Sequence, residues 1–371
     1  MDRQLRRQGL RANIAAMFSA SRGEALATIP LHVNAGVRRV INGVGYGVDE
    51  LVHRRWRSVE VRQPLFIVAP PRSGTTLLFH QLAADPRFAA PTLGNTMLRA
   101  ISVNRMLKRM AERESKGILG MRDAIDKQMA ALDDTHTLRL GRLEEDEAFF
   151  NDHFSLLNVH ILFPTLAERR GAIPVLDQRP PRFRRAVMRR YKNFIRRFLY
   201  RVGPERTYLG KNVQSMGRML SLSETFPDAR FIHIVRDPLV QLPSALGLVR
   251  AVAKGAHGRV RPPEDPYWRM VADMLIEQHL YLLEWERKLG PQRWLTLRYD
   301  DLIADPAAAL RAVYDHFQIP IPEELAPTIA GANERAGEFR KQRQYSLDDY
   351  GISADEVRER LAPVYQAYQL G

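Results

Sequence analysis

The sequence predicts an α/β fold in which a P-loop-like parallel sheet is flanked by helices, with a helical insert and extra N- and C-terminal helices. Two observations lead to this fold class. Short apolar runs rich in β-branched and aromatic residues recur along the chain, and stretches of helical periodicity separate them. One such run also leads into a tight polar turn and an amphipathic helix, an order typical of phosphate-binding loops. Strands that alternate with helices favour parallel pairing, because each connection crosses back through a helix.

Residues 1–62 are expected to form a basic helical N-terminal extension, since apolar positions such as Ile14 and Phe18 recur at helical spacing. Within this extension, the closely spaced glycines of Gly43–Val48 are interpreted as a turn. No strand precedes them, and a dinucleotide-binding loop requires one. Residues 63–371 are then expected to form one α/β domain.

Three apolar runs are expected as buried parallel strands: Leu65–Ala69, Phe231–Val235 and Trp294–Tyr299. The run Thr207–Asn212 is a candidate for a fourth strand. The helical stretch between the first strand and this candidate is too long for one crossover. We therefore expect a helical insert at about residues 90–205, of the kind that builds a substrate pocket.

Two later helices carry clear N-terminal signals. Asp305 and Pro306 supply an N-cap and a first-turn proline, and Ser353 with Glu356 forms a capping box. Within the insert, Arg182–Arg201 combines apolar positions at helical spacing with many cations. This segment is either a surface helix with a solvated basic face or a contact for a membrane surface or polyanion.

The chain has 371 residues, a formal net charge of +14 and no cysteine. The lack of cysteine excludes disulfides, cysteine–zinc sites and thiol nucleophiles. The positive charge points either to an acidic partner or to an arginine-rich composition. We recognise no secretion signal, and no apolar run reaches the ~18 residues of a spanning helix. A cytoplasmic location is expected, with peripheral membrane contact through the basic helices left open.

The turn Pro70–Thr76 follows the pattern of a nucleotide triphosphatase loop whose lysine is missing. Thr75 stands at the lysine position, and the cation is instead Arg72. Magnesium-dependent phosphoryl transfer uses the lysine and a metal to neutralise a highly charged γ-phosphate. A less charged group such as sulfuryl can rely on cationic donors and backbone N–H groups, so transfer without a metal is predicted.

A second anion site is predicted where the strand Phe231–Val235 ends. Arg236 follows this strand directly, and Ser244 lies within the next helical stretch. Ligands of open α/β sheets bind beyond the carboxyl ends of the strands, so this pair suits a second, separate phosphate. The alternative is a simple strand-to-helix turn in which Arg236 and Asp237 form a surface pair.

Two phosphate sites on one nucleotide describe 3′-phosphoadenosine 5′-phosphosulfate (PAPS). At this point the sequence resembles the PAPS-dependent sulfotransferase family, particularly the bacterial branch with a PRSGTT loop. The segment PPRSGTTLL resembles the family's 5′-phosphosulfate loop, and FPDARFIHIVRDPLVQLPS resembles its 3′-phosphate motif. The segments LRYDDLIADPAAALRAVYDHF and YSLDDYGIS resemble later parts of the family pattern in the same order, so the resemblance covers roughly residues 64–360.

The resemblance implies that PAPS donates a sulfuryl group to a hydroxyl (or amine) acceptor, with no metal. The residues implied to bind the donor in the two motifs are Arg72, Ser73, Gly74, Thr75, Thr76, Arg236 and Ser244. Arg343 is implied to bind it from a basic loop near the C-terminus that also contains Arg340 and Lys341. Arg72 and Lys211 would also act in catalysis. Lys211 stands where many relatives carry a lysine after a strand, although a surface lysine is an equal alternative.

The resemblance leaves the catalytic base open. Arg-bearing relatives often have a glutamate soon after the loop's helix, but residues 88–100 contain no carboxylate. The acidic cluster Glu144–Glu147 is the substitute, and Glu145 and Glu147 are proposed jointly. On a helix Glu144 and Glu147 would share a face, and the neighbouring phenylalanines would raise the pKa of a carboxyl. The alternatives are a structural role for the cluster, with His136 or His153 as base.

Two other functions compete with sulfuryl transfer. One is an ATP-dependent kinase with a degenerate P-loop, which magnesium dependence would reveal. The other is a basic protein that binds a polyanion or membrane and does not depend on Arg72. For the enzyme, the expected partner is a small-molecule, glycan or lipid hydroxyl acceptor, and no nucleic acid is expected.

Overall fold

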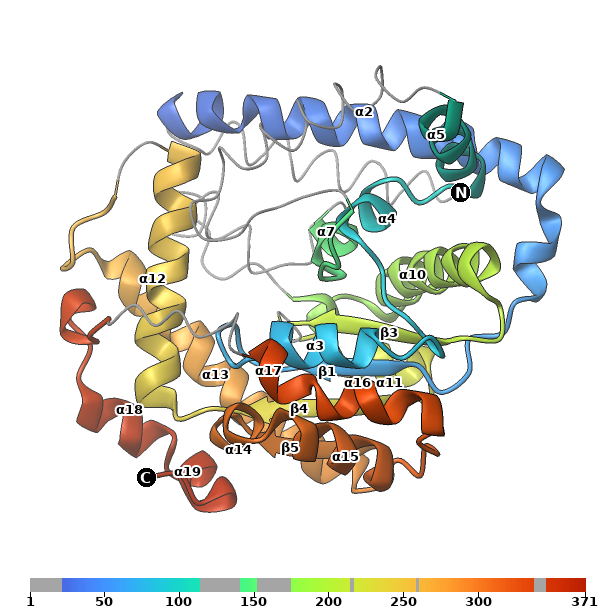
Figure 1. The fold of residues 1–371 in the computed structure, drawn as a ribbon. Coiled ribbons are helices and arrows are strands. Elements are labelled where there is room, and N and C mark those ends of the chain that lie inside the picture. The colour runs from blue at the N-terminus through green and yellow to red at the C-terminus, as the bar shows by residue number, and fades with distance from the viewer. Residues whose placement is uncertain (1–21, 114–140, 152–174, 214–216, 258–259, 337–344) are drawn as a thin grey trace. The chain divides into compact units, whose positions relative to one another are not determined.

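The computed structural model describes residues 22–113, 141–151, 175–213, 217–257, 260–336 and 345–371 (Figure 1). The chain divides into two compact units. Unit 1 consists of Met1–Val61, Pro91–Arg206 and Val249–Val260, and unit 2 consists of Arg62–Ala90, Thr207–Leu248 and Arg261–Gly371. Each unit is described by itself below.

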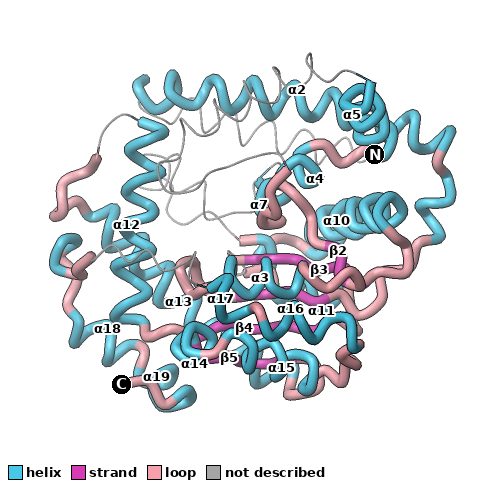
Figure 2. The backbone as a smooth tube through the Cα atoms, in the orientation of Figure 1, coloured by secondary structure: helices cyan, strands magenta, loops and turns pink. Residues whose placement is uncertain are grey.

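Unit 2 contains a five-stranded parallel sheet with the order β2-β3-β1-β4-β5 (Figure 2). The strands are β1 (Leu65–Val68), β2 (Phe88–Ala89), β3 (Thr207–Asn212), β4 (Arg230–Val235) and β5 (Trp294–Arg298). The three expected strands and the fourth candidate are confirmed. The two-residue strand β2 was not predicted, because it is too short to carry a periodic pattern.

The central strand β1 is buried along its whole length, which explains why it reads as a continuous apolar run. Its residues pair with β3 on one side and β4 on the other, so Ile67 is in register with Lys211 and Ile232. Phe66 stacks on Phe231 with ring centroids 5.8 Å apart. This core holds the carboxyl ends of β1, β3 and β4 side by side.

The helices of unit 2 follow the strands, as the predicted alternation requires. They are α3 (Thr75–Ala83), α11 (Met219–Thr225), the first part of α12 (Pro238–His257), α13 (Pro266–Leu289), α14 (Tyr299–Ala304), α15 (Pro306–His316), α16 (Ala326–Ala330), α17 (Ala332–Ala336), α18 (Ala354–Arg360) and α19 (Ala362–Tyr368). The predicted N-cap Asp305 is confirmed, since it accepts a hydrogen bond from the Ala308 N–H. Ser353 accepts one from the Glu356 N–H, but the Glu356 carboxylate binds Arg269 and Arg360, so only half of the predicted capping box is present.

Unit 1 is helical in its described residues. Its elements are α2 (Arg22–Val52), the 3-10 turn η1 (Arg54–Ser58), α4 (Leu93–Met97), α5 (Ile101–Arg113), α7 (Glu147–Asn151), the 3-10 turn η2 (Leu176–Gln178) and α10 (Pro181–Val202). None of the helices in the described part of the chain is long and apolar enough to cross a membrane.

The turn predicted at Gly43–Val48 is wrong, because these residues lie inside α2. A glycine inside a helix costs about 1 kcal/mol relative to alanine. At Gly45 this cost accompanies close helix packing, since an added Cβ would lie 2.5 Å from the Cβ of Ala100. Tertiary packing of α2 therefore overrides the local preference of glycine for turns.

The basic segment predicted as a helix is α10, and its cations are not all solvated. Arg184 and Arg197 are buried. The Arg197 guanidinium lies 3.7 Å from the centre of the Trp56 ring, and its Nε is 3.3 Å from an Asp49 carboxylate oxygen. Burial lowers the pKa of Arg197, and nearby acidic groups oppose this shift. Arg197 thus stabilises the packing of unit 1.

Candidate functional site in unit 2

The loop after β1 adopts a backbone that suits the binding of an anion. Gly74 has φ = 82° and is the N-cap of α3, so no side chain caps the first N–H groups of this helix. A Cβ at Gly74 would lie 3.0 Å from the Tyr299 ring, and the position therefore favours glycine. Arg72 also has a positive φ, 70°, which is uncommon for a residue other than glycine. Such backbone strain is concentrated at functional sites.

Two hydroxyl residues of this loop are buried. Ser73 has 0% exposure and Thr75 has 4%. The Ser73 Oγ has no hydrogen-bond partner among the described residues. A buried hydroxyl without a partner costs free energy, so this position is suited to a ligand that supplies one. The orphaned hydroxyl and the uncapped helix N-terminus lie next to each other in the chain.

Lys211 is held beside the loop by the sheet. Its pairing with Ile67 brings it to the carboxyl end of β3, next to the end of β1. The side chain is buried at 3% exposure, and its Nζ donates a hydrogen bond of 3.1 Å to the Thr76 hydroxyl. The ammonium also lies 5.7 Å from the centre of the Phe79 ring. Lys211 is therefore not a surface lysine.

Arg236 and Ser244 belong to the same cluster as Arg72. The Arg72 Nε donates to the Ser244 hydroxyl at 3.2 Å, and the Arg236 guanidinium donates to the Arg72 carbonyl at 2.8 Å. Arg236 also lies over the Tyr299 ring at 4.1 Å. Burial lowers the pKa of Arg236, with the Arg72 charge acting in the same direction and Tyr299 and nearby aspartates opposing it.

The Arg–Asp–Pro turn is more than a surface pair. Asp237 accepts a hydrogen bond of 2.9 Å from the Leu239 N–H at the start of α12. It also accepts one of 2.7 Å from the Tyr365 hydroxyl on α19. Asp237 thus fixes the start of α12, which carries Ser244, and the neighbouring Arg236 keeps its contacts with the loop.

A second layer of polar residues supports the loop. The Gln241 Nε2 donates to the Pro71 carbonyl at 2.6 Å, and its Oε1 lies 3.1 Å from the His279 Nε2. Because the Gln241 oxygen can only accept, we assign the proton of His279 to Nε2. Burial lowers the pKa of His279 to about 4, which keeps this ring neutral near pH 7. Gln278 donates to the Val213 carbonyl at 2.8 Å.

Sequence reasoning missed Gln241, Gln278 and His279. Gln278 and His279 lie on a helix with no motif around them, and Gln241 lies within the predicted 3′-phosphate motif without having been singled out. The role of each arises from a long-range contact. The signal that was available is the spacing between Arg236 and Ser244, since Gln241 lies between them on α12. That spacing places the helix against the loop but does not identify the residue that makes the contact.

The proposed bases lie in unit 1. The expectation that Glu144 to Glu147 share one helix is wrong, because α7 begins at Glu147. The preceding segment is extended instead, and the Glu144 N–H donates to the Pro91 carbonyl at 3.1 Å. Glu145 is half-buried and Glu147 is buried at 6% exposure. Asp146 between them is fully buried and accepts a hydrogen bond from the Tyr191 hydroxyl.

Several predicted residues lie outside the described residues: Arg340, Lys341, Arg343, His136 and His153. Among the residues whose placement is described, no group of three or more His, Asp or Glu side chains could hold a metal ion. In the described part of unit 2, the positive charge at the loop comes from Arg72, Lys211 and Arg236.

A model of the sulfotransferase family matches residues 64–323, which is more than half of the chain. The chain therefore belongs to the sulfotransferase family, and the resemblance found in the motifs is confirmed. It is similar to two relatives, the omega-hydroxy-beta-dihydromenaquinone-9 sulfotransferases Stf3 of Mycobacterium bovis and Mycobacterium tuberculosis. Each is 31% identical over 254 residues, which cover 68% of this chain and 62% of the relative. The aligned part of the chain thus spans less than two thirds of these relatives.

Two solved structures share the fold. Sulfotransferase STF9 from Mycobacterium avium superposes with a TM-score of 0.76 at 17% identity, covering 100% of this chain and 93% of the other. Sulfotransferase STF1 from Mycobacterium tuberculosis gives a TM-score of 0.70 at 19% identity, covering 95% and 92%. These likenesses confirm the predicted α/β fold.

Proposed function

We propose that the chain is a sulfotransferase that moves a sulfuryl group from PAPS to a hydroxyl (or amine) acceptor. The observation that carries this proposal is the hydrogen-bonded cluster at the ends of β1 and β4. There Arg72 contacts Ser244, and Arg236 contacts the backbone of Arg72. One loop thus joins the two groups that the family pattern associates with two separate phosphates.

The residues present fit such a donor. The uncapped N-terminus of α3, the orphaned Ser73 hydroxyl and the glycine at position 74 suit the 5′-phosphosulfate. Arg236 and Ser244 suit the 3′-phosphate, because an arginine fork and a hydroxyl can both donate to its oxygens. Thr75 and Thr76 add hydroxyls at the first turn of the same helix.

The mechanism follows from the charges around the loop. The donor supplies an electrophilic sulfuryl group and a phosphate leaving group. Arg72 and Lys211 stabilise negative charge on the oxygen that joins the two, together with the N–H groups of α3. The hydrogen bond of 3.1 Å from the Lys211 ammonium to the Thr76 hydroxyl supports this role. Glu145 and Glu147 remain the proposed bases that take the proton of the acceptor.

The proposed acceptor is a small-molecule, lipid or glycan hydroxyl. The support comes from the Stf3 relatives, whose name describes a sulfotransferase acting on an omega-hydroxylated menaquinone, a lipid alcohol. In the same proposal, residues 63–371 are the sulfotransferase-like domain and residues of about 90–205 are its insert. The proposed location is cytoplasmic, with peripheral contact to a membrane.

The test measures the binding of 3′-phosphoadenosine 5′-phosphate (PAP) to the purified chain by the shift that it causes in thermal unfolding. PAP should raise the midpoint of unfolding more than 5′-AMP or ATP with magnesium at equal concentration, because a bound ligand stabilises the folded state. If ATP with magnesium stabilises the protein and PAP does not, the proposal is wrong and the kinase alternative gains support.

A further inference from the structure

Helix α2 exposes its apolar side. Six apolar residues of this helix recur at spacings of one, three, four and seven residues and are each 53–75% exposed: Val33, Val37, Val40, Val44, Leu51 and Val52. We call these six residues the α2 stripe. Spacings of three, four and seven residues place five of them along one side of the helix, and Val52 adjoins this side at the helix end. A row of exposed apolar side chains on a globular protein marks an interaction surface.

The opposite side of α2 is polar, and it is the side that packs inside unit 1. The Asn42 side chain donates to the Met97 carbonyl at 2.8 Å. The Asp49 carboxylate accepts hydrogen bonds from the N–H groups of Ile101 and Ser102, at 2.9 and 2.8 Å. This arrangement is the reverse of an ordinary surface helix, which buries its apolar side. The exposure of the α2 stripe is therefore not a consequence of poor packing, because α2 is anchored through its other side.

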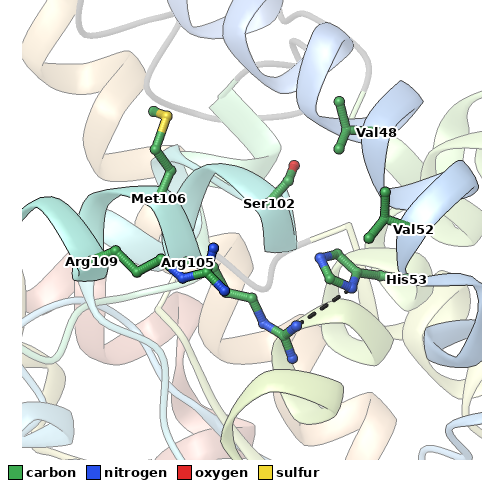
Figure 3. A pocket seen from close by; sticks show the side chains of 7 residues that line it. All are labelled: Val48, Val52, His53, Ser102, Arg105, Met106 and Arg109. Carbon is green, nitrogen blue, oxygen red and sulfur yellow. Dashed lines mark hydrogen bonds between the residues drawn. The ribbon is translucent and has the colours of Figure 1, made fainter.

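A groove of about 450 Å³ lies beside the C-terminal end of the stripe, between α2 and α5 (Figure 3). Val48, Val52 and Met106 give it apolar walls, and Arg105 and Arg109 stand one turn apart on α5. Figure 3 shows both arginines at the edge of the groove, with Arg105 directed toward His53. The groove thus combines apolar and cationic surface.

Both arginines of the groove are exposed, and neither pairs with a carboxylate among the described residues. Their neighbour His53 does not add a charge near pH 7, since burial and then the charge of Arg105 lower its pKa. The Arg105 guanidinium lies 3.5 Å from the His53 Nδ1, which fits a neutral ring that accepts a hydrogen bond. Two guanidinium groups with no carboxylate partner in the described part of the chain attract an anion.

We propose that the α2 stripe and the α2–α5 groove form a face that docks on an anionic phospholipid bilayer. The stripe enters the boundary of the acyl chains, and Arg105 and Arg109 bind lipid phosphates. Charge complementarity favours this partner over a second copy of the chain. A second copy would bring the same arginines and the same net charge of +14 to the interface. The proposal does not depend on the proposed enzymatic activity.

The test is co-sedimentation of the full chain with vesicles of phosphatidylglycerol and phosphatidylcholine, compared with vesicles of phosphatidylcholine alone. The wild type should bind the mixed vesicles at least tenfold more tightly. The double variant Val40→Asp/Val44→Asp should weaken this binding tenfold or more, because two charges would enter the acyl boundary. The control is Ile321→Asp, an exposed apolar position in unit 2, which should bind like the wild type.

The role of charge is tested with matched variants. Arg105→Gln/Arg109→Gln should lose most of the preference for phosphatidylglycerol. Arg311→Gln/Arg358→Gln removes the same charge from exposed positions in unit 2 and should retain it. Equal binding by the stripe variant and the wild type overturns the proposal. Equal binding of the wild type to vesicles with and without phosphatidylglycerol also overturns it. Light scattering completes the test: if the stripe variant changes the molar mass of the chain and leaves vesicle binding intact, the face belongs to a second copy.

Discussion

The loop cluster of unit 2 and the α2–α5 groove of unit 1 use arginine in opposite ways. In the loop cluster, Arg236 is partly buried, lies over Tyr299 and donates to the backbone of Arg72. In the α2–α5 groove, Arg105 and Arg109 are exposed and have no carboxylate partner among the described residues. The first arrangement holds a cation in a fixed position, which the proposed binding of the donor's phosphates requires. The second leaves cations available to a surface whose charges are mobile.

The largest effect is expected for the acidic cluster of unit 1. Either Glu145→Gln or Glu147→Gln should lower kcat about 10²–10⁴-fold and leave PAP affinity unchanged, because a positioned base acts on the acceptor. Turnover and PAP binding should be measured on the same preparations. Glu324→Gln, an exposed glutamate of unit 2, serves as control. Near-native turnover of both variants would show that the cluster is structural and that the chemistry is confined to other residues.

Arg72→Ala should lower kcat about 10²–10³-fold, with a smaller effect on PAP affinity. The reason is that Arg72 stabilises charge that grows in the transition state. The assay is run with EDTA and, separately, with magnesium, and the proposal predicts the same rate in both. Arg311→Ala, which removes an exposed arginine of the same unit, should keep full activity. A strict requirement for magnesium would contradict the proposed mechanism.

The support behind the loop is tested at Gln241. Gln241→Leu removes the donor to the Pro71 carbonyl and the acceptor for His279, both in a buried region. Loss of a buried partner costs about 1–3 kcal/mol, so the free energy of unfolding should fall by about this amount. PAP affinity should fall with it, because the loop loses its support. Urea unfolding and calorimetry give the two values, and an unchanged affinity would mean that the loop is held by other contacts.

A change of pH should alter the free energy of unfolding through two buried histidines. Burial lowers the pKa of His279 to about 4 and that of His233 to about 3, from an ordinary value of 6.5. The unfolded chain therefore binds protons below pH 6.5 that the folded chain does not bind. Each histidine should reduce the free energy of unfolding by about 1.4 kcal/mol per pH unit as pH falls from 6.5 toward the folded pKa. Urea unfolding at pH 7 and 5 measures this slope, and His279→Gln should reduce it.

Much of unit 2 could be predicted from the sequence, because short stretches of sequence indicate its strands and its loop. The strands β1, β4 and β5 are apolar runs between helical stretches, and β3 was a candidate beside them. The loop residues Arg72 and Gly74 are recognised by their order after a strand. That Lys211 reaches Thr76 could not be predicted, because this contact depends on the register of β3 against β1.

Unit 1 was harder to predict, because its structure depends on contacts between distant segments. The glycines of Gly43–Val48 favour a turn locally, but Gly45 packs against Ala100 inside a helix. Glu144 was expected in a helix, but its backbone pairs with Pro91 in an extended segment. In both cases a tertiary contact outweighs the local preference, and no motif in the sequence signals that contact.

The most direct test of the central claim is a calorimetric comparison of PAP and 5′-AMP binding to the wild type and to Arg236→Ala. The account predicts that the wild type binds PAP at least tenfold more tightly than AMP, because Arg236 and Ser244 engage the 3′-phosphate. Loss of this charge-assisted pair costs about 1.5–3 kcal/mol, so Arg236→Ala should remove most of the preference for PAP over AMP. Equal affinities of the wild type for PAP and AMP would contradict the account.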